Sequence, residues 1–235
     1  MRQSSPFHMK NKIPKSLIAI LVVFLVLFID QLTKIWVKTH MGLYDSINIT
    51  PWFKIYFVEN NGMAFGIEAV GKLFLSAFRI IAVIAIIIYL NKLIKQDYKT
   101  GFIVCISLIL AGASGNIIDS VFYGAIFEAS YPGHIASFVP FGEGYAPLLH
   151  GKVVDMLYFP IIETSIPDWI PLVGGKDVLF FRFIFNIADA SITIGVIILL
   201  LFYRKTLSYS LLSKKEREKL AQKKLAKEKG INSEA

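Results

Sequence analysis

The last apolar segment of the chain, residues 178–203, carries polar side chains where they could do chemistry. If the segment is helical, one face holds its polar residues: Arg182, Asn186, Asp189 and Thr193. The segment is long enough to cross a bilayer, which takes roughly 20 residues. Because an ionisable side chain in hydrocarbon is costly, Asp189 is a candidate functional residue.

A second carboxylate, Asp155, lies in the preceding connector and can reach the same level of the membrane as Asp189. Two carboxylates without a matching cation repel each other, so a close pair is a poor structural device. Near neutral pH such a pair shares one proton. The ionised member can take a proton from an attacking water while the protonated one hydrogen-bonds a peptide carbonyl oxygen. The pair could therefore carry out an acid–base reaction such as amide hydrolysis, with either residue able to start protonated.

Four apolar segments are predicted to cross the membrane and to position these groups. They are residues 17–37, 73–94, 101–121 and 178–203. The composition agrees, because 55% of the 235 residues are hydrophobic and the mean hydropathy of +0.59 is too high for an ordinary soluble domain. We expect one four-helix transmembrane domain over residues 1–205, with outer connectors 39–72 and 122–177 and a basic cytoplasmic tail over 206–235.

Basic residues cluster before the first segment, between the second and third, and after the fourth. The positive-inside rule therefore places both termini in the cytoplasm and both long connectors outside. Ten of the 25 Lys and Arg residues follow the fourth segment: Arg204, Lys205, Lys214, Lys215, Arg217, Lys219, Lys223, Lys224, Lys227 and Lys229. Beside a membrane span, such a tail is expected to face anionic lipid rather than nucleic acid, with a solvated helical tail as the alternative. The first segment carries Asp30 and Lys34 and lacks a small-residue cleavage site, so we do not expect a removable signal peptide.

Several other polar residues are predicted to lie at the depth of Asp189. At about 1.5 Å per residue, Asp30 lies about 20 Å above the inner edge, and Asn116 and Asp119 about 23–27 Å above it. The same count places Asp189 about 21 Å above that edge. Three segments therefore bring carboxylates or amides to one level near the outer face.

Most of these residues also have a purely structural interpretation. Asp30 and Lys34 are four residues apart and are expected to pair and brace the helices. The small residues of the run 111–115 are expected to form a close-packing face. Asn116 and Asp119 could bridge helices or contact a substrate, and the sequence favours neither role.

Other hydrolytic chemistries lack the residues they need. The run Gly112-Ala113-Ser114-Gly115 matches the GxSG of rhomboid-type serine proteases, but all four histidines lie outside the predicted spans. A Ser–Lys dyad built on Lys34 stays open, without a distinctive motif. The sequence has no HExxH motif and no cysteine or histidine cluster that would predict a zinc site. Arg79 is expected to extend toward the membrane surface, and Cys105, the only cysteine, to be a packing residue.

Five short motifs, in order along the chain, resemble those of the lipoprotein signal peptidases (signal peptidase II), bacterial aspartic proteases of the inner membrane. The similar stretches are Asp30-Gln31-Leu32-Thr33-Lys34 (DxxTK), Asn60-Asn61-Gly62-Met63-Ala64-Phe65 (NxGxAF), Gly112-Ala113-Ser114-Gly115-Asn116-Ile117-Ile118-Asp119 (GAxGNxxD), Val153-Val154-Asp155 (VxD) and Phe185-Asn186-Ile187-Ala188-Asp189 (FNxAD). The resemblance extends from the first span to Tyr203.

This resemblance implies that Asp155 and Asp189 are the catalytic pair. It also implies substrate-binding positions at Asn60, Gly62, Asn116 and Asn186, and structural support from Asp30, Lys34 and Asp119. The implied substrates are prolipoproteins whose cysteine carries a diacylglyceryl group. The signal peptide would be cut just before that cysteine, without metal or cofactor, and globomycin would inhibit the reaction.

The implied fold is an all-α membrane protein with four transmembrane helices, a small extracytoplasmic β-sheet and a long outer connector. Residues 50–58 are β-branched and aromatic, and predict a strand of that sheet that ends in a turn at Asn60-Asn61-Gly62. We expect a multi-pass protein of the bacterial inner membrane, monomeric, in contact with lipid and without a nucleic-acid partner, with its active site near the outer face.

Two features depart from the family pattern. The family usually has Arg directly after the third-box Asp, where this chain has Ser120. Arg182 is one candidate for the missing cation. The connector after Asp119 is also longer than usual, and the resemblance assigns no role to the insertion 122–150.

Two alternatives remain at the level of sequence. A small transporter or lipid-handling protein could use the intramembrane charges as a relay: Asp30, Lys34, Asp119 and Asp189. The lack of duplicated halves and the position near one face weaken that hypothesis. An inactive relative acting as a binding factor is the other alternative, because of Ser120.

Overall fold

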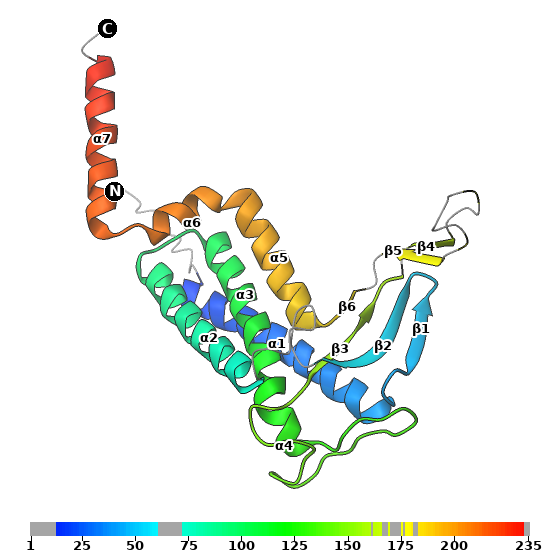
Figure 1. Cartoon of the computed structure of the whole chain (residues 1–235). Coiled ribbons are helices and arrows are strands. Elements are labelled where there is room, and N and C mark those ends of the chain that lie inside the picture. Colours follow the sequence, from blue (N-terminus) through cyan, green and yellow to red (C-terminus); the bar gives the residue numbers. More distant parts are fainter. Residues whose placement is uncertain are drawn as a thin grey trace, which may run out of the picture.

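A computed structural model describes residues 13–60, 72–160, 162–165, 169, 175, 177–180 and 183–232 of the chain. Its main helices are α1 (Lys15–His40), α2 (Lys72–Lys95), α3 (Thr100–Ile118) and α5 (Ile187–Phe202). Helix α3 packs against each of the other three. Figure 1 shows this bundle with a small sheet at one end and helices α6 and α7 at the other.

Three helical stretches among the described residues are long and apolar enough to cross a membrane. They are α1, α2 and Thr100–Ile126, in which α3 continues through the π-helix η2 (Asp119–Tyr123) and α4 (Gly124–Ile126). Helices α5 and α6 (Arg204–Leu211) give a fourth span if taken together, but they meet at an angle of 91°. The fold is therefore mostly helical with three or four candidate spans.

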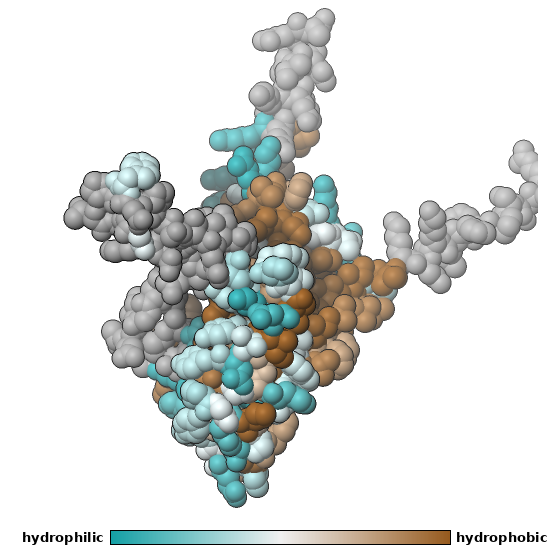
Figure 2. Space-filling view, turned by 90° about the vertical axis from the view of Figure 1, so that its right-hand side faces the viewer, coloured by the Kyte–Doolittle hydropathy of each residue, from teal (hydrophilic) through white to brown (hydrophobic). Residues whose placement is uncertain are grey.

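Large apolar side chains of α1 face away from the bundle. Leu21, Phe24, Phe28 and Leu32 are all more than half exposed, as expected for a helix that contacts lipid. Figure 2 shows hydrophobic residues gathered over the helices, while the lower end of the molecule is largely hydrophilic.

Helix α5 begins later than the sequence indicated. Its first residue is Ile187, and the residues before it form strands β5 (Asp177–Phe180) and β6 (Ile184–Phe185). The helix starts here because Asn186 is extended and caps it: the Asn186 Oδ1 accepts from the Asp189 amide at 2.9 Å. The predicted helix over 178–203 is therefore wrong in its first part, and Asn186 is not on a helical face with Asp189.

A four-stranded antiparallel sheet adjoins the end of the bundle where α5 begins (Figure 1). Its order is β1 (Ser46–Thr50), β2 (Phe53–Asn60), β3 (Val153–Tyr158), β6. In the register of β2 and β3, Asn60 lies opposite Val153 and Val58 opposite Asp155. The predicted strand is confirmed over residues 53–58; Asn61 and Gly62, of the predicted turn, lie outside the described residues. A separate pair, β4 (Ile162–Ser165) with β5, precedes β6.

The long connector between α4 and β3 is closely packed on the end of the helices. Its backbone returns to η2 and α4, with the Gly151 amide donating to the Ser120 carbonyl and the Ala146 amide to the Gly124 carbonyl, each at 2.9 Å. A Cβ at Gly151 would come within 2.0 Å of the Asp119 carbonyl oxygen, so only glycine fits this contact.

Side chains from this connector also enclose a buried charge cluster. Lys38 is fully buried, donates to Ser130 Oγ at 2.9 Å and pairs with Glu59 at 2.5 Å. Ser130 also donates to Glu59, at 2.9 Å. The connector thereby joins α1 to the end of β2.

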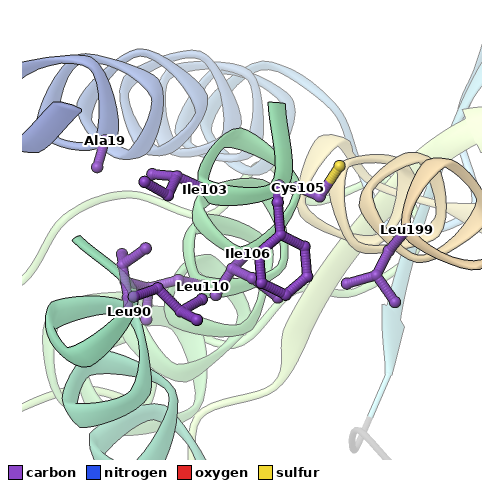
Figure 3. Packing of buried hydrophobic residues seen from close by; sticks show 9 residues of the cluster. Ala19, Leu90, Ile103, Cys105, Ile106, Leu110 and Leu199 are labelled. Carbon is purple, nitrogen blue, oxygen red and sulfur yellow. The ribbon is translucent and has the colours of Figure 1, made fainter. Parts of the chain in front are cut away.

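The interior of the bundle is built on α3. Figure 3 shows Cys105 and Ile106 of α3 packing with Leu90 of α2 and Leu199 of α5. Cys105 is a buried free thiol, which confirms its predicted role in packing. A Cβ at Gly112 would lie 2.2 Å from the Ala188 carbonyl oxygen, so the predicted small-residue face does allow α5 to approach α3.

Beyond the bundle, the basic tail forms α7 (Lys214–Asn232). It is joined to the bundle by Arg217, which donates to the Ser210 carbonyl at 2.7 Å and to Gln96 Oε1 at 2.9 Å.

Candidate active site

Two carboxylates from different elements meet where the sheet joins the bundle. Asp155 lies on β3, and Asp189 lies in the first turn of α5. Two asparagines link them: Asn186 Nδ2 donates to Asp155 Oδ1 at 2.7 Å, and Asn116 Nδ2 donates to Asp189 Oδ1 at 2.8 Å. Asn186 Nδ2 also donates to Asn116 Oδ1, at 3.1 Å. These bonds form one chain from carboxylate to carboxylate, and each bond joins residues 31 or more positions apart.

The environment of Asp155 favours its protonated form. Only 5% of the residue is exposed, and burial raises the pKa of its carboxyl to about 7, with a further contribution from the charge of Asp189. Asn60 Nδ2 donates to its other oxygen at 3.2 Å, from the end of β2. The site therefore combines a carboxyl whose pKa lies near neutral with a second carboxylate close enough to influence it.

A buried ion-pair network supports the pair from α1 and η2. Lys34 is fully buried, and its Nζ lies 2.9 Å from Asp30 and 2.8 Å from Asp119. It also donates to Asn116 Oδ1 at 2.9 Å. The predicted Asp30–Lys34 pair is confirmed, with Asp119 as a second anion. Because an ammonium has three donors, these three acceptors satisfy Lys34 completely.

This network also fixes the two elements that carry the carboxylates. Asp30 Oδ1 accepts from the Ala188 amide in the first turn of α5, at 2.9 Å. Asp119 Oδ2 accepts from the Val154 amide, next to Asp155, at 3.3 Å. The supporting residues thus act on the positions of Asp189 and Asp155 through backbone contacts.

Gln31 is a member of this network that sequence reasoning missed. Its Nε2 donates to Asp119 Oδ1 at 2.9 Å and to Asp30 Oδ2 at 3.1 Å, and its Oε1 accepts from the Tyr123 hydroxyl at 3.2 Å. The sequence signal that could have identified Gln31 was an amide side chain directly after Asp30, inside a predicted span.

The surroundings of Arg79 differ from the prediction that its side chain extends toward the membrane surface. It is half-buried, and its Nη1 donates to Ser120 Oγ at 3.4 Å rather than only extending toward a surface. The charges of Asp189, Asp119 and Asp155 all act on its guanidinium. Arg182, the predicted substitute cation, and Gly62, a predicted substrate-binding residue, lie outside the described residues.

The arrangement is able to carry out acid–base chemistry. In the described part of the chain, no group of three or more His, Cys, Asp or Glu residues is arranged to hold a metal ion. The carboxylate pair, with amide donors on both members, has the composition needed to activate a water and to protonate a leaving group.

Comparison with known proteins gives one consistent result. The family described as signal peptidase (SPase) II matches residues 22–204. A lipoprotein signal peptidase of Porphyromonas gingivalis is 50% identical over 206 residues, covering 87% of this chain and 91% of that protein. One of Amoebophilus asiaticus is 36% identical over 195 residues, covering 79% and 77%. A solved bacterial membrane enzyme is 30% identical, with a TM-score of 0.52 over 83% of this chain and 93% of its own.

Proposed function

The chain belongs to the signal peptidase II family, and from this premise we propose that it is an intramembrane aspartic endopeptidase. Its substrates would be bacterial prolipoproteins with a diacylglyceryl-modified cysteine, and it would cut just before that cysteine. The family supports signal-peptide removal from lipoproteins in general. The observation that supports the aspartic mechanism is the pairing of Asp155 and Asp189 through Asn186 and Asn116.

The mechanism assigns one proton to the pair. Asp155 holds it near neutral pH, because its pKa is raised to about 7. Asp189 takes a proton from water as the water oxygen bonds to the scissile carbonyl carbon, and Asp155 gives its proton to the carbonyl oxygen. In the second step Asp189 returns a proton to the leaving nitrogen, the C–N bond breaks, and Asp155 recovers its proton as the new carboxyl group forms.

The asparagines would orient both the pair and the substrate. Asn60 and Asn186 donate to the two oxygens of Asp155, and Asn116 donates to Asp189. Such donors fix the carboxylate planes, and they can exchange with the backbone of a bound peptide. The exposed apolar faces of the helices would accommodate the acyl chains, with the sheet at the outer membrane surface.

The contacts of Lys34 argue against a proton or headgroup relay. Its three donors are satisfied inside the protein, and Lys34, Asp30 and Asp119 are fully buried. A relay needs groups that exchange partners with solvent or ligand. The described network instead fits a fixed support for α5 and β3.

The direct test is cleavage by the purified protein. A diacylglyceryl-modified prolipoprotein should be cut before the modified cysteine, and globomycin should inhibit the cut. The same precursor without the lipid should be left intact. Binding of the precursor without cleavage would instead identify an inactive relative. If the protein neither bound nor cleaved the precursor, the proposal would be contradicted.

We expect the cleavage rate to fall as the pH rises through about 7, the value to which burial and Asp189 raise the pKa of Asp155. Below that pH Asp155 carries the proton that the carbonyl oxygen needs, and above it Asp155 has lost that proton. Initial rates at saturating substrate from about pH 5 to about pH 9 measure this limb. A rate that stays constant over the alkaline half would contradict the assignment of the proton to Asp155.

A further inference from the structure

Arg79 brings a cation to the carboxylate pair from a helix that carries none of the residues assigned so far. It lies seven residues into α2, roughly 10 Å along the helix from Lys72. An arginine within an apolar span is costly and is kept for a partner or a function. Among the described contacts, Arg79 donates to Ser120 Oγ, which in turn donates to the Asn116 carbonyl at 2.9 Å.

The site holds more carboxylates than Lys34 neutralises, so a second cation could act there. Four carboxylates face the region where the sheet joins the bundle: Asp30, Asp119, Asp155 and Asp189. Lys34 neutralises the first two and has no donor left for a substrate. The charge of Asp189 acts on Arg79, and hydrogen bonds through Ser120 and Asn116 connect the two residues.

The packing places the guanidinium where a substrate can meet it. Among the described residues α2 packs chiefly on α3, while Asp189 belongs to α5. Arg79 is half-buried, unlike fully buried Lys34. A peptide bound at Asp189 would therefore lie near an arginine that is not fully buried.

We propose that Arg79 is a substrate-binding residue, whose guanidinium donates to a backbone carbonyl oxygen of the prolipoprotein next to the scissile bond. The planar fork of an arginine holds a carbonyl more firmly than the point charge of a lysine does. Ser120 Oγ accepts from this guanidinium, and the small side chain of Ser120 leaves room for a cation that comes from α2. This inference rests on the proposed peptidase function.

Steady-state kinetics of three variants on the diacylglyceryl prolipoprotein test the assignment. Arg79→Gln should raise KM by about 30-fold or more, with a much smaller change in kcat, because a contact made in the bound substrate is lost. Arg79→Lys keeps the charge without the fork and should raise KM by about tenfold. In Arg79→Ala/Ser120→Arg the substituted side chain on η2 can place a guanidinium in the space that Arg79 leaves. Most of the rise in KM should then be reversed.

Arg204→Gln, which removes an exposed arginine at the other end of the bundle, is the matched control and should keep the kinetics of the unchanged protein. Thermal unfolding in detergent reports any loss of fold. Unchanged KM in Arg79→Gln, or in a folded Arg79→Lys if the glutamine variant does not fold, would overturn the proposal. So would a rise in KM in Arg79→Ala/Ser120→Arg as large as the rise in Arg79→Gln. Either result leaves the peptidase function standing, as long as the unchanged protein still cleaves.

Discussion

Asp155→Asn and Asp189→Asn should each lower kcat for prolipoprotein cleavage by roughly 10³-fold or more. Asparagine keeps the size of each side chain but cannot accept the proton from water or donate one to the carbonyl oxygen. The neighbouring donors, Asn186 and Asn116, still find an amide oxygen at either position. The variants should therefore fold, and single-turnover cleavage in detergent, with unfolding followed in parallel, separates lost chemistry from lost structure.

Asp97→Asn supplies the matched change away from the site. Asp97 is 88% exposed in the link between α2 and α3, where it pairs with Lys15, and such surface pairs contribute little. Its cleavage rate should stay within a factor of about two of the unchanged protein. If either Asp155→Asn or Asp189→Asn cleaved at a comparable rate, the two-carboxylate mechanism would have to be abandoned.

Lys34→Met should lower the free energy of unfolding by about 3–5 kcal/mol. The substitution leaves Asp30 and Asp119 fully buried without their shared cation, and an uncompensated buried charge costs far more than a lost contact. Removing the charges as well, in Asp30→Asn/Lys34→Met/Asp119→Asn, should recover part of the loss. Reversible unfolding of the purified protein in mild detergent gives the three values.

Lys15→Met, at the opposite end of α1, is the control for this series. Lys15 is a quarter exposed and pairs with exposed Asp97, so its loss should cost no more than about 1 kcal/mol. Equal destabilisation by Lys15→Met and Lys34→Met would show that the buried network has no special role in stability.

The sequence indicated most of the elements because membrane spans and buried ion pairs leave strong local signals. The i,i+4 spacing of Asp30 and Lys34 was enough to predict their pairing. The start of α5 could not be found in this way, because residues 178–185 are as apolar as the helix that follows. Hydropathy does not distinguish a strand from a helix in such a run, and the cap at Asn186 decides the boundary.

The members of the site differ in how far the sequence could place them. Asp155 and Asp189 were predicted to meet, and the structure links them through asparagines whose partners no spacing rule reveals. The contact of Arg79 with Ser120 depends on the rotation of α2 against α3, which small shifts in helix packing determine. Gln31 was missed because an uncharged amide in an apolar run gives only a weak signal.

The Lys38–Glu59–Ser130 cluster has a consequence for anyone shortening the chain. Ser130 of the connector donates its hydroxyl hydrogen to Glu59. The next residue, Asn60, donates to Asp155. A deletion that removes Ser130 would withdraw that hydroxyl from Glu59 and uncover the ammonium of Lys38. Variants of minimal size should thus retain residues 127–131, or replace Glu59 and Lys38 together with an apolar pair.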